Sequence, residues 1–228
     1  MTLKNIIKNR EKNKTHFVWN NIQVFLKDPI TSEEVKIHSV LAIIKKKIPI
    51  HLLKNVETIY VGQFDFFKER EIQAMYENSS IFVTNEQDSE DDMCDDIIHE
   101  IAHSVEDMHK EKIYSDGDLE EEFKQKRQKL YLTLKAEGLP VEPSSFTNCS
   151  YSKDFDEYLH KEIGYPLLNV ISTDIFYSPY AITSLREYFA NGFEAFFYFG
   201  DYDFVRRSCP QLFNKLSMLL EDNHDQEY

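Results

Sequence analysis

The residues with the clearest chemistry in this chain are five consecutive ones, His99-Glu100-Ile101-Ala102-His103. They form the H-E-x-x-H pattern of zinc peptidases. Residues four apart lie on one face of an α-helix, so His99 and His103 can offer their imidazoles to one metal ion. Glu100 is turned by about 100° around the helix and can reach a water on that metal as a general base. The pattern predicts a catalytic site with one Zn²⁺ per chain.

The sequence around the motif favours a helix that buries one face. Apolar residues recur at helical spacing on both sides of it, at Ile97, Ile98, Ile101, Ala102 and Val105. His99 and His103 fall outside this stripe, so a helix packed through the stripe would turn them towards a cleft. The alternative is a pair of surface histidines on an amphipathic helix. Cys94, just before the motif, is expected to pack rather than to bind metal.

A catalytic zinc site needs three protein ligands and an open position for water, so the chain must supply one more ligand. No H-x-x-G-x-x-H extension follows His103, which excludes the metzincin arrangement. Residues 184–197 have a strong helical apolar period, with Glu187 and Glu194 on the opposite side. Glu187 also fits a capping box with Ser184. Spacing alone leaves Glu187, Glu194 or neither as the third ligand.

Composition and charge limit the class of protein. The chain has 228 residues, of which 42% are hydrophobic, enough for a sizeable core. A net charge of −14 argues against a nucleic-acid partner and against binding to an anionic membrane. Three widely spaced cysteines without a C-x-x-C pair predict thiols rather than a disulfide framework.

The chain shows neither a transmembrane segment nor a secretory signal, because no apolar run is long enough and residues 1–14 lack an apolar core. Cytoplasmic residence is the default expectation, and export by a route without a cleaved signal stays open. The oligomeric state is also open.

The remaining patterns predict an α+β fold with a small mixed sheet and several helices. Strands are expected at 58–64 and 80–84, and residues 17–26 could be a strand or the start of a helix. Helices are expected at 35–47, 118–138, 154–163, 184–199 and 210–220, with 164–180 irregular.

The segment HEIAHSVED, followed by Tyr180-x₆-Glu187-Tyr-Phe-Ala-x-x-Phe, resembles the catalytic domain of anthrax lethal factor and its relatives. Those proteins are zinc endopeptidases of the gluzincin type, and the related Pro-Pro endopeptidases share the arrangement. The resemblance implies His99, His103 and Glu187 as zinc ligands and Glu100 as the base. It implies that Tyr180, seven residues before Glu187, stabilises the oxyanion.

The resemblance extends unevenly over residues 35–220 and implies a zincin-like fold with H-E-x-x-H and third-ligand helices. One catalytic domain is expected at 16–222, after a flexible lead-in at 1–15 and before a tail at 223–228. The gap between His103 and Glu187 is longer than expected for the family, so a helical lobe is inserted at about 110–165. Ala102 stands where the family often has glycine, and Asn191 where lethal factor has a glutamate.

The expected function is zinc-dependent cleavage of peptide bonds in a protein or peptide substrate. In zincins an extended substrate adds to an edge strand, and residues 80–84 are the expected edge here. Asp107 could orient a ligand histidine, although surface placement suits it equally. The alternatives are a non-catalytic zinc-binding or protein-interaction domain on the same scaffold, and a helical interaction protein that uses no zinc.

Overall fold

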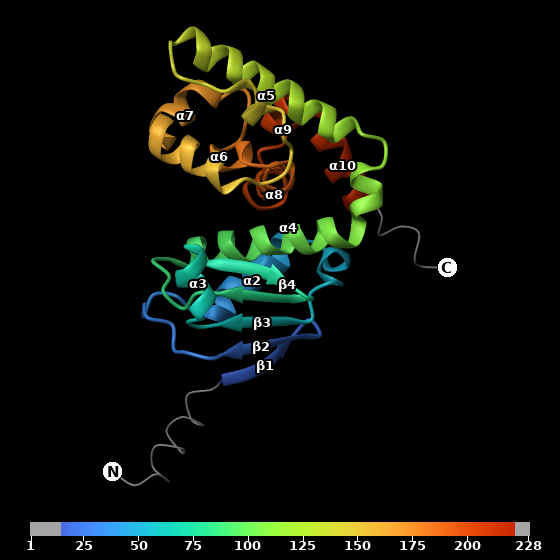
Figure 1. The fold of residues 1–228 in the computed structure, drawn as a ribbon. Helices are drawn as coiled ribbons and strands as arrows, with labels where there is room; N and C mark the ends of the chain where they lie inside the picture. The colour runs from blue at the N-terminus through green and yellow to red at the C-terminus, as the bar shows by residue number, and fades with distance from the viewer. Residues whose placement is uncertain (1–14, 222–228) are drawn as a thin grey trace. The chain divides into compact units, whose positions relative to one another are not determined.

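The computed structural model describes residues 15–221 and has an α+β fold, as predicted (Figure 1). The expected lead-in, except Thr15, and the expected tail lie outside the described residues. The chain divides into two compact units between Val105 and Glu106. This boundary falls inside helix α4 (Glu90–Tyr114), whose backbone leaves helical geometry at His109. The second unit holds the expected 110–165 insertion together with the segment that follows it.

The first unit is built on a five-stranded mixed sheet. The strand order is β1 (Thr15–Trp19), β2 (Ile22–Leu26), β3 (Thr58–Val61), β5 (Ser80–Val83) and β4 (Ala74–Glu77). Strands β2, β3 and β5 run parallel, whereas β1 and β4 pair antiparallel with their neighbours. Residues 17–26 are therefore the greater part of a β-hairpin rather than one element. Its two-residue turn places Asn20 and Asn21 at positive φ, which hairpin turns of this length require.

The prediction that residues 80–84 form an edge of the sheet is wrong, because β5 is paired on both sides, with β3 and with β4. The turn residues Asn78 and Ser79 both have positive φ and fold the preceding segment back along β5. Strand β4 is therefore an edge of the sheet. Its sequence, Ala-Met-Tyr-Glu, alternates too weakly between apolar and polar residues to predict a strand.

The sheet has one apolar face and one aromatic face. Val24, Ile59 and Ile81 are fully buried and lie in register across the three parallel strands. Their neighbours Phe25, Tyr60 and Phe82 stack in a row on the opposite face, with ring centroids 5.2 and 5.1 Å apart. Period-two alternation of this kind follows from the pleat, since successive side chains point to opposite faces.

Helical segments complete the first unit. Helix α2 (Ile37–Lys47) buries Ile37, Val40, Leu41 and Ile44, and a short 3₁₀ turn follows at Ile50–Leu53. A one-turn helix, α3 (Asp65–Arg70), precedes β4. The N-terminal part of α4 runs alongside the sheet (Figure 1). Cys94 on α4 is fully buried, with Sγ 3.8 Å from the Val40 carbonyl oxygen, which confirms the expected packing role.

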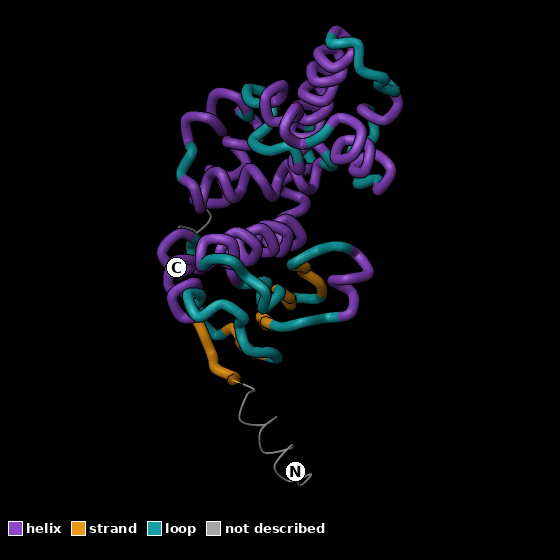
Figure 2. The backbone as a smooth tube through the Cα atoms, turned by 90° about the vertical axis from the view of Figure 1, so that its left-hand side faces the viewer, coloured by secondary structure: helices purple, strands orange, loops and turns teal. Residues whose placement is uncertain are grey.

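In the described residues, the second unit is helical and the strands belong to the first (Figure 2). Its helices are α5 (Asp118–Ala136), α6 (Lys153–Glu157), α7 (Tyr165–Ser172), α8 (Leu185–Phe193), α9 (Tyr202–Ser208) and α10 (Pro210–Glu221). The helices expected at 118–138 and 210–220 are confirmed. Those expected at 154–163 and 184–199 each change into a π-helix, at Tyr158–Ile163 and Glu194–Phe199. Residues 164–180 are not irregular throughout, since α7 begins there at Tyr165 with proline in its first turn.

Within residues 15–221, the helices all fall short of the length and apolarity needed to cross a bilayer. The three cysteines are thiols, as expected, and form no disulfide with one another.

Helix α5 buries three charged side chains: Glu122, Lys126 and Arg127 are 9%, 8% and 1% exposed. The carboxylate of Glu122 accepts the Tyr188 hydroxyl at 2.8 Å. It also accepts the backbone N–H groups of Gln211 and Leu212 at the start of α10. Those two N–H groups have no partner within their own helix, so Glu122 caps α10 from outside.

Lys126 and Arg127 bind backbone carbonyls rather than carboxylates. Lys126 donates to the Ile175 carbonyl, after α7, and to the Ser208 carbonyl at the end of α9. The guanidinium of Arg127 donates to the carbonyls of Ser145 and Asn148 and lies over the ring of Phe155 at 4.3 Å. Helix α5 therefore connects most segments of the second unit through charge-assisted hydrogen bonds.

Candidate metal centre

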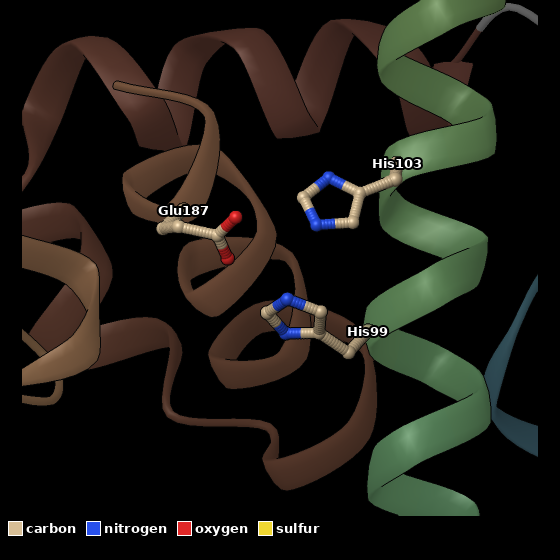
Figure 3. Close-up of side chains that lie close together, drawn as sticks. All are labelled: His99, His103 and Glu187. Atoms are coloured by element: carbon tan, nitrogen blue, oxygen red, sulfur yellow. The ribbon is translucent and has the colours of Figure 1, made fainter. Parts of the chain in front are cut away.

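The two motif histidines project from the same side of α4 (Figure 3). Their ring centroids are 4.8 Å apart and the ring planes are nearly perpendicular, at 84°. The apolar stripe that flanks them is at most 1% exposed at Ile97, Ile98, Ile101, Ala102 and Val105. The predicted separation of faces is confirmed: the stripe anchors the helix, and the imidazoles leave it on another side.

The carboxylate of Glu100 is oriented by the edge strand. Its Oε2 accepts the backbone N–H of Tyr76 on β4 at 2.6 Å, a short charge-assisted hydrogen bond. The Tyr76 hydroxyl in turn accepts the Asn55 amide at 2.7 Å, and Asn55 also donates to the Ser104 carbonyl on α4. Asn55 and Glu100 thus fix α4 against β4 within the first unit.

In the second unit, Glu187 lies in the first turn of α8. Ser184 is the N-cap residue, with an extended backbone, and its Oγ accepts the Glu187 N–H at 3.1 Å. The side-chain amide of Asn191, one turn later, donates to the Glu187 carbonyl at 3.0 Å. Glu187 is buried, at a helix position where a negative charge is favoured by the macrodipole. The Ser184 half of the predicted capping box is confirmed.

Tyr180 begins a single 3₁₀ turn, Tyr180–Ile182, directly before α8. The Ser178 hydroxyl accepts the Ala181 N–H and donates to Oδ1 of Asn191 at 2.5 Å, so this turn is tied to the helix that carries Glu187. The Tyr180 side chain is 36% exposed. Burial around its hydroxyl, and then the charge of Glu187, raise the pKa of Tyr180 well above its usual range. The hydroxyl is protonated at neutral pH, as that of an unperturbed tyrosine also is, and can donate a hydrogen bond.

His99, His103 and Glu187 form a possible metal-binding group, with ligand atoms that all lie within 4.8 Å of one another (Figure 3). His99 and His103 come from α4, and Glu187 comes from α8. Two imidazoles and a carboxylate suit Zn²⁺, and three protein ligands leave an open position for water. Glu194, the alternative from spacing, is buried in the π-helix and does not belong to this group.

Sequence reasoning missed a polar cluster on α4 and α8, formed by Glu106, Tyr114 and Arg186. Asp107 is exposed, so of its two expected placements the one on the surface is confirmed. Glu106 instead bonds both its oxygens: Oε1 accepts the Tyr114 hydroxyl at 2.8 Å, and Oε2 lies 3.3 Å from Nε of Arg186. Burial raises the pKa of Glu106, and burial together with Glu106 raises the pKa of Tyr114. No local pattern links Glu106 to Arg186 so far along the chain.

Comparison with protein-family profiles, with curated proteins and with solved structures finds no match. The resemblance to the lethal-factor catalytic domain therefore rests on the motif residues and their spacing.

Proposed function

We propose that this protein is a zinc-dependent endopeptidase of the gluzincin type, with a zincin-like fold, that hydrolyses peptide bonds in a protein or peptide substrate. The observation that carries the proposal is the group formed by His99, His103 and Glu187. Two of these residues come from an H-E-x-x-H helix, and the third comes from a separate helix that carries the E-Y-F-A-x-x-F pattern of the resembled family. Glu100 and Tyr180 complete the residue types that such a reaction needs.

Each residue has a chemical role in this proposal. His99, His103 and Glu187 hold Zn²⁺, which when bound lowers the pKa of a water to about 7. Glu100 takes the proton of the attacking water and passes it to the leaving amine. Tyr180, whose hydroxyl is protonated at neutral pH, donates a hydrogen bond to the oxyanion that develops on the peptide carbonyl.

The position of β4 at the edge of the sheet is an argument for a peptide substrate. The strand pairs with β5 along one side, and an extended chain that adds to its other side would replace the hydrogen bond from the Tyr76 N–H to Glu100. Glu100 is bonded to this strand through Tyr76, which puts the proposed base beside the backbone along which such a peptide would lie.

A second candidate is a zinc-binding or protein-interaction domain without catalysis. The observation in its favour is the same Tyr76–Glu100 hydrogen bond, because it gives Glu100 a structural role that needs no reaction. The two candidates make the same prediction for metal content and opposite predictions for peptide cleavage.

Zinc stoichiometry by elemental analysis in wild type, Glu187→Ala and Glu194→Ala tests the metal centre that both candidates share. Cleavage of a peptide library by the zinc-loaded wild type then separates the two candidates. Glu194 is a matched control because, like Glu187, it is a buried glutamate. It lies in the π-helix after α8 and does not belong to the possible metal-binding group. We expect about one zinc per chain in wild type and in Glu194→Ala, and weakened binding in Glu187→Ala. Wild type that holds no zinc after metal reconstitution would overturn the proposal.

A further inference from the structure

Glu106 connects the helix of the histidines to the helix of Glu187. It lies three residues after His103 on α4, and its ion-pair partner Arg186 directly precedes Glu187 on α8. The Tyr114 hydroxyl holds its second carboxylate oxygen. One side chain thus reaches from the immediate continuation of the H-E-x-x-H motif to the residue next to the third ligand.

The connection is stiff at its α4 end. The backbone of α4 departs from helical geometry only at His109, after Glu106. Three helical residues rise about 4.5 Å, so Glu106 stands at a fixed offset from His103, about one turn away.

The Glu106–Arg186 pair differs from a surface ion pair. The Glu106 side chain is 13% exposed and the Arg186 side chain is 53% exposed, so the carboxylate is shielded while the guanidinium keeps access to water. With Tyr114 on one oxygen and Arg186 on the other, the carboxylate has a defined orientation. The exposed pair Lys161–Glu157 has no such shielding, with side chains 62% and 45% exposed, and pairs of that kind contribute little.

The first turn of α8 is held from two sides. Arg186 is tied to α4 through Glu106, and Tyr188 is tied to α5 through Glu122. Successive helical residues are turned by about 100°, so Arg186 and Tyr188 point about 200° apart and Glu187 projects between them. Two bonds on opposite sides fix the rotation of the helix about its axis, which decides where the Glu187 carboxylate points.

We propose that Glu106, Tyr114 and Arg186 are positioning residues for the metal ligand Glu187: they set the rotation of α8 about its axis and thereby the direction of the Glu187 carboxylate. This inference rests on the proposed function. It predicts that three side chains that do not touch the metal affect the metal affinity of the protein. Residues that orient metal ligands commonly have this effect.

The test measures metal affinity rather than turnover. Zn²⁺ dissociation constants are determined by competition with a chromophoric chelator for wild type, Glu106→Gln, Tyr114→Phe, Arg186→Met and Arg186→Lys. Asp107→Asn is the matched control, because it removes a neighbouring exposed carboxylate of α4. We expect Glu106→Gln and Arg186→Met to weaken binding about 10- to 100-fold, Arg186→Lys to recover part of the loss, and Asp107→Asn to match wild type. The milder Tyr114→Phe keeps the test informative if Glu106→Gln folds poorly.

Two further readouts separate positioning from general stability. The visible spectrum of the Co²⁺-substituted protein should change in Glu106→Gln and not in Asp107→Asn, since it reports the ligand geometry. The double variant Glu106→Gln/Arg186→Met should bind zinc no more weakly than either single variant, because both remove the same connection. A folded Glu106→Gln with wild-type zinc affinity and cobalt spectrum would overturn this inference and leave the proposed function standing. Wild type without zinc would overturn both.

Discussion

The backbone N–H of Tyr76, on the edge strand β4, donates a 2.6 Å hydrogen bond to Oε2 of Glu100 on α4. The bond gives the carboxylate proposed as general base a fixed orientation before any substrate arrives. It also means that Glu100 holds the helix to the strand, so a change at this position can affect the fold as well as the chemistry.

The substitution Glu100→Gln separates these two roles. Glutamine has the same shape and keeps an oxygen that can accept the Tyr76 N–H, so the fold and the zinc content should be retained. Its amide cannot take a proton, and we expect peptide cleavage to fall by at least about 100-fold. Cleavage of a quenched-fluorescent peptide library measures this, with zinc content determined on the same preparation. Undiminished cleavage would show that Glu100 is not the base.

Tyr180→Phe should lower kcat while leaving zinc content unchanged. The phenylalanine ring fills the same space, and only the hydrogen bond to the developing oxyanion is lost. Removing one such donor typically costs about 10²–10³ in kcat. Tyr177→Phe is the control, because Tyr177 is a nearby tyrosine whose hydroxyl bonds Asp201 instead. Equal losses in the two variants would argue against the role proposed for Tyr180.

Gly192 is the position where α8 and α10 approach most tightly among the described glycines. A Cβ there would lie 2.1 Å from Cδ2 and 2.9 Å from Cγ of Leu212, which is itself buried. We expect Gly192→Ala to lower the free energy of unfolding by about 1–3 kcal/mol through overpacking. Leu212→Ala should relieve the clash, so the double variant should lose less stability than the sum of the two single changes. Urea unfolding of the four proteins checks this, and strict additivity would contradict it.

Tyr188 should make the fold sensitive to alkaline pH. Burial, and then the neighbouring Cys209 and Glu122, raise the pKa of Tyr188 well above its usual value. Above pH about 10 the unfolded chain releases this proton and the folded chain keeps it. The folded state then binds more protons, so the free energy of unfolding falls as pH rises, by about 1.4 kcal/mol per pH unit for this group.

The measurement for Tyr188 is urea unfolding between pH 9 and pH 11 in wild type and Tyr188→Phe. The variant loses the hydrogen bond to Glu122 and should be less stable at pH 9, yet its stability should fall less steeply above pH 10. Identical slopes would show that Tyr188 does not titrate differently in the two states.

The site was more predictable than the scaffold around it. The stripe from Ile97 to Val105 has an unambiguous helical period, and a period of that strength reports burial directly. Ser184 and Glu187 announce a helix start through local capping, which needs no knowledge of the rest of the fold. These signals are short-range, and the structure places their residues as the patterns predict.

The parts that were missed depend on long-range pairing. Strand β4 becomes an edge because Asn78 and Ser79 turn it back on β5, and neither edge nor interior can be read from the letters of one strand. On α5, Glu122, Lys126 and Arg127 look like the solvated face of a charged helix. They are buried because their partners are carbonyls, N–H groups and a hydroxyl from residues 145–212, which a periodicity cannot anticipate.

The buried charges of α5 also bear on how this chain could change over evolutionary time. Once the backbone of several later segments relies on Glu122, Lys126 and Arg127 for its hydrogen bonds, losing α5 would strand those groups without partners, each at a cost of about 1–3 kcal/mol. We expect the segment to be entrenched: related chains can vary its exposed face freely, whereas a shortened chain would need many compensating changes at once. Helix α5 would thereby be a condition for folding of the second unit.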